Sequence, residues 1–160
     1  MKIKKAFTLI ELIIFMGIFS ILIFILTDIF ISSLKTKTSS ESSAAINQDA
    51  RFIFAKLTSD INNANSIISP DLGVSSSTLD LILYGIPETI RLNNNNIELI
   101  TGGTTYVLNG INSRITNLAF TRLGNDLGKN TIRINLTLQS SAVVNKNPEI
   151  ISLETTVGLR

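Results

Sequence analysis

Carboxylates are the main candidates for chemistry in this sequence, because the chain contains neither histidine nor cysteine. Imidazole bases, thiolate nucleophiles, disulfides and the common zinc sites are therefore excluded. From residue 60 onward the acidic residues are Asp60, Asp71, Asp80, Glu88, Glu98, Asp126, Glu149 and Glu154. None of them forms a tight pair in the sequence. Two of them could still meet in the fold, as the two carboxylates of a glycosidase do, and that alternative stays open.

The sequence gives little basis for a bound metal or cofactor. The segment from Asn125 to Asn130 offers oxygen ligands and a glycine, but it lacks the spacing of an EF-hand loop. We interpret this segment as a plain turn. The chain also lacks a glycine-rich phosphate loop. We therefore expect no catalytic residue, no metal and no cofactor, and the chain is not expected to be an enzyme.

Glu11 is the carboxylate whose position most needs an explanation, because it lies inside an apolar run from Phe7 to Ile31. As a helix this run would be about 37 Å long, enough to cross a hydrocarbon core of about 30 Å. A carboxylate near the centre of a bilayer costs about 2.5 to 3.5 kcal/mol, and less near the interface, so such residues are functional candidates. The alternative is that Glu11 merely lies at the level of the lipid headgroups.

The apolar run is best interpreted as a membrane anchor. Lys2, Lys4 and Lys5 precede it and should hold the N-terminus in the cytoplasm, with the rest of the chain outside. A buried core helix is an alternative, but so long an apolar run is unusual in a small soluble domain. A cleaved secretory signal peptide is another, although the run is longer than usual and Ser32–Ser33 is a weak cleavage site.

Beyond the apolar run, the sequence predicts that the helix continues as an amphipathic one. No glycine or proline occurs between Ile18 and Ile68, and Pro70 and Gly73 should close the helix. Apolar residues recur at intervals of three and four, which is one stripe on a helix. The stripe consists of Ile46, Ala50, Ile53, Leu57, Ile61 and Ala64. We expect one helix over residues 7–66, whose stripe covers a sheet.

The remaining residues, 67–160, alternate between apolar and polar side chains as β-strands do. Two turns are predicted between strands, one at Asn93–Asn96 and one at Gly102–Gly103, where both glycines can adopt a positive φ. Five to seven largely antiparallel strands are expected, with one face covered by the helix. The predicted fold class is therefore α+β, with a long N-terminal helix packed on a C-terminal, mainly antiparallel sheet domain.

The segment Lys5-Ala6-Phe7-Thr8-Leu9-Ile10-Glu11-Leu12 resembles the prepilin processing motif of type IV pilins and type II secretion pseudopilins. The resemblance implies that a prepilin peptidase cuts between Ala6 and Phe7 and methylates the new amine of Phe7. It also implies that Glu11, the fifth residue after the cut, neutralises that amine on a neighbouring subunit. Ala6 stands where the family usually has glycine, so the efficiency of cleavage is left open.

Looser similarities point toward a J-type minor pseudopilin or a minor pilin. The segment from Gln48 to Phe52 is similar to the second helical half of such proteins, as are the runs 115–120 and 153–160. Major pilins often have a proline within the helix and a C-terminal disulfide, and neither occurs here. Some pseudopilins bind calcium in loops like 125–130, and whether this loop does so is left open.

The resemblance implies a structural subunit of a type IV pilus or type II secretion-like filament, divided into leader 1–6, membrane or filament-core helix 7–31, amphipathic helix 32–66 and extracytoplasmic β-domain 67–160. The implied partners are other pilin subunits, the prepilin peptidase, inner-membrane assembly machinery and, before assembly, membrane lipid. The alternative function is a signal-anchored extracellular binding domain that never polymerises. Secretion, twitching, adhesion and DNA uptake are not distinguished.

The distribution of charge argues against a nucleic-acid partner. The whole chain has 14 Lys plus Arg and 12 Asp plus Glu, a net charge of +2. Removing residues 1–6 removes three lysines, which leaves 14 − 3 = 11 basic against 12 acidic side chains, or −1. The basic character therefore belongs to the leader, and the predicted mature chain is nearly neutral.

Overall fold

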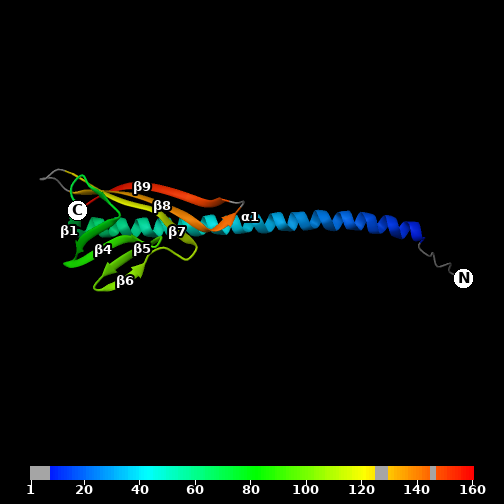
Figure 1. Ribbon diagram of the computed structural model, residues 1–160, viewed down its shortest axis with the longest axis horizontal. Coiled ribbons are helices and arrows are strands. Elements are labelled where there is room, and N and C mark those ends of the chain that lie inside the picture. The colour runs from blue at the N-terminus through cyan, green and yellow to red at the C-terminus, as the bar shows by residue number, and fades with distance from the viewer. Residues whose placement is uncertain (1–7, 125–129, 145–146) are drawn as a thin grey trace. The chain divides into compact units, whose positions relative to one another are not determined.

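The structure is a computed structural model that describes residues 8–124, 130–144 and 147–160. Within these residues, one helix, α1 (Leu9–Asn63), precedes nine strands (Figure 1). The strands are β1 (Ala64–Ser69), β2 (Ser75–Ser76), β3 (Thr78–Leu83), β4 (Ile86–Asn93), β5 (Asn96–Thr101), β6 (Thr104–Val107), β7 (Ser113–Leu123), β8 (Thr131–Val144) and β9 (Asn147–Gly158). The chain divides into two compact units, Met1–Ser39 and Ser40–Arg160. The predicted α+β fold class is confirmed.

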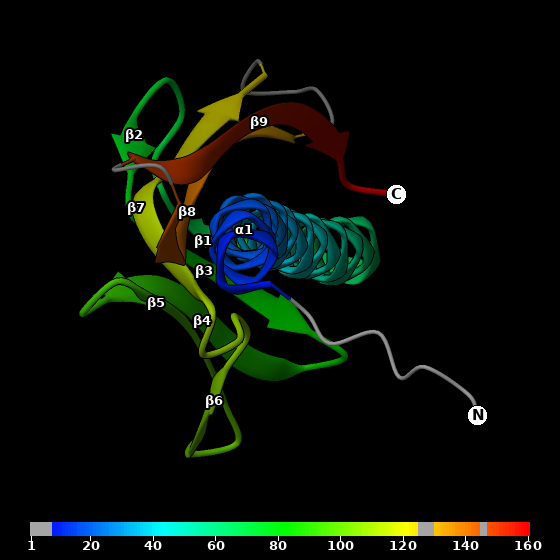
Figure 2. The ribbon, with the colours of Figure 1, turned by 90° about the vertical axis from the view of Figure 1, so that its right-hand side faces the viewer.

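The second unit contains two antiparallel sheets rather than one. The first sheet has five strands in the order β1-β3-β4-β5-β6, and the second has four in the order β2-β7-β8-β9. In Figure 2 the strands β8 and β9 lie on one side of the second part of α1, and β3 to β5 lie on another. The helix therefore supplies a packing surface to both sheets.

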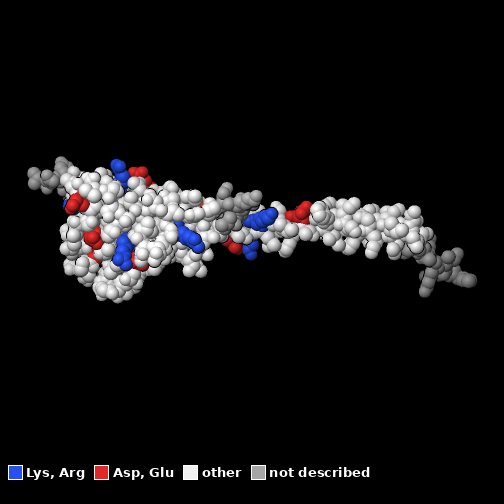
Figure 3. Space-filling view, in the orientation of Figure 1, with Lys and Arg blue, Asp and Glu red and all other residues white. Residues whose placement is uncertain are grey.

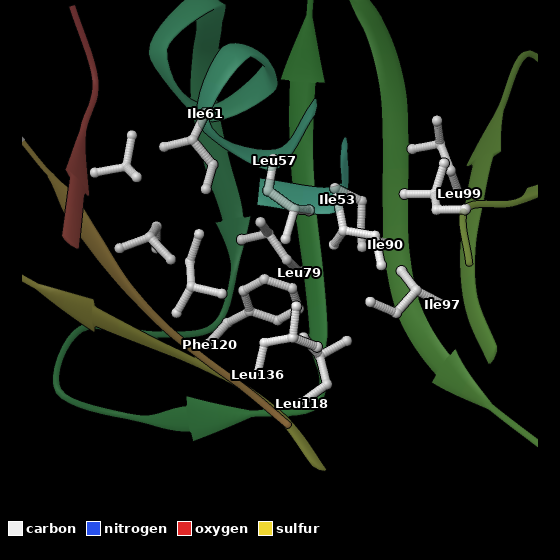
Figure 4. Packing of buried hydrophobic residues seen from close by; sticks show 14 of the residues in the cluster. Ile53, Leu57, Ile61, Leu79, Ile90, Ile97, Leu99, Leu118, Phe120 and Leu136 are labelled. Carbon is white, nitrogen blue, oxygen red and sulfur yellow. The ribbon is translucent and has the colours of Figure 1, made fainter. Parts of the chain in front are cut away.

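The core of the second unit is formed by the predicted helix stripe and the inner faces of both sheets. Ile53, Leu57 and Ile61 of α1 are completely buried, as is Ile46 about two turns further toward the N-terminus. Figure 4 shows Ile53, Leu57 and Ile61 facing both sheets. The residues that they face there are Leu79, Ile90, Ile97 and Leu99 of the first sheet and Leu118, Phe120 and Leu136 of the second. Burial of side chains of this size supplies the main stabilisation of the domain.

Both predicted turns are confirmed. Asn94 and Asn95 join β4 to β5 with φ values of 48° and 64°, a conformation that asparagine tolerates better than most residues. Gly102 and Gly103 join β5 to β6 with φ values of 56° and 80°. These two tight connections fix the register of three consecutive strands, because each strand must fold straight back on the one before.

The helix ends three residues earlier than the sequence pattern predicts, at Asn63 instead of residue 66. Strand β1 begins at once with Ala64, which stays buried as a strand residue. Asparagine has a weak helix propensity, and the Asn63 side-chain amide donates a 2.8 Å bond to the Ser59 carbonyl at the helix end. The apolar spacing continued through this change of structure, so it could not reveal the boundary.

The number of strands also exceeds the five to seven expected. Part of the excess is β1, which the sequence pattern had assigned to the helix end and the segment after it. Another part is β2, which has only two residues, Ser75 and Ser76, yet pairs with Thr121 and Phe120 of β7. A two-residue polar strand has no periodicity to detect, so only its distant partner defines it.

Candidate functional site

The first turn of α1 is fixed by a threonine cap. The Leu12 amide donates to the Thr8 carbonyl at 3.2 Å, and the Glu11 amide donates to the Thr8 hydroxyl at 3.3 Å. Thr8 is thus the N-cap, and Glu11 occupies the third helical position, as in the capping-box pattern Thr-x-x-Glu. A carboxylate here also interacts favourably with the positive end of the helix dipole. Glu11 therefore has a local structural role in addition to any role between subunits.

The residues on which processing depends lie next to this cap. Lys2, Lys4, Lys5, Ala6 and Phe7 are outside the described residues. The cleavage position and the topology signal consequently stay predictions. The described part establishes that the helix begins at Leu9, two residues after the predicted new N-terminus. A cut before Phe7 would leave the helix cap intact.

The part of α1 within the first unit presents apolar side chains on every side. From Leu9 to Leu34, nineteen large hydrophobic residues are exposed. On the face seen in Figure 3, this part of the helix is white over most of its length, whereas charged side chains gather on the second unit. α1 is long and apolar enough to cross a membrane, by length and composition, and it is the one such helix among the described residues. We interpret this surface as one that lipid or other apolar helices must cover.

Two hydroxyl groups in the apolar segment donate hydrogen bonds within the helix itself. The Ser20 hydroxyl donates to the Met16 carbonyl and the Thr27 hydroxyl to the Ile23 carbonyl, both at 2.8 Å. Because their donors are satisfied, these residues cost little in an apolar environment. Apart from its chain neighbours and the nearby helix backbone, no atom lies within 4 Å of a Cβ added at Gly17. The chain's own packing therefore does not require a glycine at position 17.

Four of the eight candidate carboxylates accept hydrogen bonds from side chains of their own chain or form ion pairs with them. Glu98 accepts from Asn93 at 2.8 Å and pairs with Arg91 at 2.8 Å, and these two contacts, in this order, lower its pKa. Glu149 accepts from Ser43 at 2.6 Å, and Glu154 pairs with Arg133 at 3.3 Å. Asp80 accepts from Thr89 at 2.6 Å, Asp71 is exposed, and Asp126 lies outside the described residues. Within the described ranges, no group of three metal-binding side chains occurs.

Asp60 and Glu88 are the acidic pair that the structure brings together. Asp60 lies on α1 and Glu88 on β4, and each side chain is only 4% exposed. Burial, and after it the nearby Asp60 carboxylate, raises the pKa of Glu88 from 4.5 to about 7. Lys56 contacts Asp60 at 2.7 Å. Because both acids are enclosed in the core, they are not accessible to a substrate and do not form a glycosidase-like site.

Asp49 joins the helix to the loop between β6 and β7. Its carboxylate accepts the Gly110 amide at 2.9 Å and the Ser113 hydroxyl. A Cβ added at Gly110 would lie 3.0 Å from an oxygen of this carboxylate, so any other residue at this position would force the carboxylate to shift. Sequence reasoning noted Asp49 only as part of a loose similarity, because its partners lie some sixty residues away in the chain.

Replacing Gly110 with alanine is expected to lower the free energy of unfolding by about 1 to 3 kcal/mol. The new methyl group would displace the Asp49 carboxylate and weaken two hydrogen bonds to a charged acceptor. Urea denaturation of the full chain in detergent, followed by circular dichroism, measures this change. Asp71→Asn, at an exposed carboxylate, is the control and should stay within about 0.5 kcal/mol of the wild type. Equal effects of the two substitutions would contradict the proposed close contact.

Comparison with known protein families finds a similarity at the N-terminus. The prokaryotic N-terminal methylation motif matches residues 1–27. The match includes the Thr8–Glu11 cap and much of the apolar helix, but not the segments that resembled a J-type subunit, which therefore gain no support. No curated protein and no solved structure matches the chain. Residues 1–27 carry the prokaryotic N-terminal methylation motif, which indicates type IV pilin-like processing and assembly in a membrane-anchored protein.

Proposed function

We propose that this chain is a structural subunit, a minor pilin or pseudopilin, of a type IV pilus or type II secretion-like filament. The observation that carries the proposal is the coincidence of the methylation motif with an apolar helix exposed on every side. A helix of this kind needs an apolar environment in every state of the protein. Lipid supplies that environment before assembly, and the neighbouring helices of a filament supply it afterwards.

In this proposal, residues 1–6 are a leader that keeps the N-terminus in the cytoplasm and the β-domain outside. A prepilin peptidase cuts between Ala6 and Phe7 and methylates the Phe7 amine. Assembly machinery of the inner membrane then transfers the subunit into the filament. The transfer moves the apolar segment of α1 from one apolar environment to another, so it involves little loss of hydrophobic burial.

Glu11 acts as the register residue in this proposal. The mature N-terminal amine carries a positive charge that the positive end of its own helix dipole disfavours. A carboxylate on an adjacent helix, held in position by the Thr8 cap, can neutralise that charge when two subunits are correctly aligned. An unpaired Glu11 in an apolar surrounding is costly, so misaligned subunits are disfavoured.

Mass spectrometry of the N-terminus tests the proposal. In cells with a prepilin peptidase, we expect a chain that begins at N-methylated Phe7. Ala6→Leu is the matched control, because a bulky side chain before the cut should block cleavage and leave the leader attached. A wild-type chain that keeps Met1, or is cut near Ser33, would contradict the proposal and favour a signal-anchored binding domain that does not polymerise.

A further inference from the structure

The buried contact between the end of α1 and the first sheet contains more acid than base. Asp60 lies in the buried stripe of α1, between Leu57 and Ile61, and Glu88 is on the inner face of β4. One oxygen of each, Asp60 Oδ2 and Glu88 Oε1, is fully buried and has no hydrogen-bond donor beside it. The two carboxyl groups are close enough to hydrogen-bond to each other. Two ionised carboxylates could not form that bond, because neither would have a hydrogen to donate.

Charge counting gives the same result. Lys56 lies 2.7 Å from Asp60 Oδ1 and is the cation that acts on the pair. With one proton on the two acids, the cluster of Lys56, Asp60 and Glu88 is neutral. Without that proton it carries an uncompensated negative charge in the core, which is strongly unfavourable.

The neighbouring strands do not offer another counter-charge. Glu88 pairs with Leu81 on β3 and with Thr101 on β5, both of which are uncharged. Asp80 and Arg91 are one residue out of phase with these inner positions, so they lie on the opposite face of the sheet, as does Glu98, the partner of Arg91. Lys56 and Asp60 are therefore the charged groups that face Glu88 among the described residues.

We propose that Asp60 and Glu88 share one proton, and that this proton holds the end of α1 on the first sheet, so that the β-domain loosens as the medium becomes alkaline. Glu88 donates the shared hydrogen to Asp60, and on titration the proton passes to water. This property is independent of filament assembly, since it concerns only how the end of α1 packs on the first sheet within the second unit.

The direction of the pH effect follows from linkage. The pKa of Glu88 is about 7 in the folded chain, whereas its ordinary value, expected in the unfolded chain, is 4.5. Between pH 4.5 and pH 7 the folded state therefore binds more protons than the unfolded state. Stability is therefore highest at acid pH and falls as the pH rises through this window, after which it levels off. The unfolding equilibrium constant can rise by up to about tenfold for each pH unit within the window. The absence of histidine and cysteine makes this slope easy to see, because the side chains that ordinarily titrate near neutrality are missing.

The test is urea denaturation of the full chain in detergent at several pH values from about 5 to 8. For the wild type, we expect the unfolding constant to increase by about tenfold to a hundredfold over this range. Glu88→Gln retains a hydrogen-bond donor but cannot ionise, so its stability should be nearly independent of pH. Glu98→Gln is the matched control on the outer face, and it should keep the wild-type slope because the pKa of Glu98 is lowered, away from the window. A flat wild-type profile, or an unchanged slope in Glu88→Gln, would overturn the proposal.

Two further measurements cover other outcomes. If Glu88→Gln does not fold, infrared spectroscopy of the folded Glu11→Gln chain should show a protonated-carboxyl band that disappears with a midpoint near pH 7. Glu11 is replaced in this experiment so that a carboxyl group in the apolar segment does not contribute to the same infrared band. Absence of the band at about pH 6 would overturn the proposal. Calcium that restores stability at about pH 8 would also overturn it, because a bridging cation would then replace the proton.

Discussion

Chains carrying Glu11→Gln are expected to insert into the membrane like the wild type but to enter filaments at least about tenfold less. Glutamine preserves the shape of the side chain and is also favoured at the third position of a capping box. It cannot neutralise the amine of a neighbouring subunit. Loss of one member of a buried charge pair typically costs about 2 to 5 kcal/mol, which exceeds a factor of ten. The ratio of subunit in sheared filaments to subunit in membranes measures the effect.

Thr8→Ala is the matched control for this experiment. It removes the hydroxyl that caps the Glu11 amide and should weaken the first turn by about 1 kcal/mol, but it leaves the carboxylate in place. We expect it to reduce incorporation much less than Glu11→Gln does, provided that both variants are shown by mass spectrometry to be cleaved. If Glu11→Gln is incorporated normally, Glu11 does not set register. If Thr8→Ala is equally harmful, the helix cap is what matters.

Phe120→Ala is expected to lower the free energy of unfolding of the β-domain by about 3 to 5 kcal/mol. Phe120 is the largest of the completely buried side chains, and it lies on β7 opposite Ile134. Both sheets and the helix enclose it (Figure 4), so the cavity that alanine leaves cannot collapse easily. Without a disulfide, the domain depends on such packing for a total stability of about 5 to 15 kcal/mol.

Phe52→Ala is the control, because it makes the same substitution at an exposed position. Phe52 lies on α1 with 54% of its surface exposed, so its loss should change stability by no more than about 0.5 kcal/mol. Urea denaturation of both variants, as full chains in the same detergent, gives the comparison. Similar costs for the two would mean that Phe120 is not a core residue.

Local features of the fold could be predicted from the sequence, whereas the assignment of strands to two sheets could not. The helix stripe, the asparagine turn and the Gly102–Gly103 turn each depend on residues close together in the chain. The separation into two sheets depends on pairings such as that of Ser76 with Phe120. Such a pairing depends on which strand edges remain available after the other strands have paired, and no local sequence pattern contains that information.

The acidic pair was missed although each member left a trace in the sequence. Asp60 occupies a position of the apolar helix stripe, one residue before Ile61. Glu88 is in phase with Ile90 on an alternating strand, so it points to the core face. A charged residue at a position where the pattern calls for an apolar one predicts a buried partner. Which residue is that partner is known only once α1 is seen to pack on β4. Glu11 differs because a local motif identified it.

The burial of the helix stripe also determines how the β-domain responds to mechanical load. From Ser42 to Ile61 the buried residues of α1 extend over about 29 Å, at about 1.5 Å per residue. Polar contacts occur along the same length, from Ser42 with Ser140 to Asp49 with Ser113. Tension applied along the helix axis loads these contacts together in shear, so they share the force and do not break one after another. A subunit built in this way can transmit a pull from its helix to its sheets without unfolding at one end first.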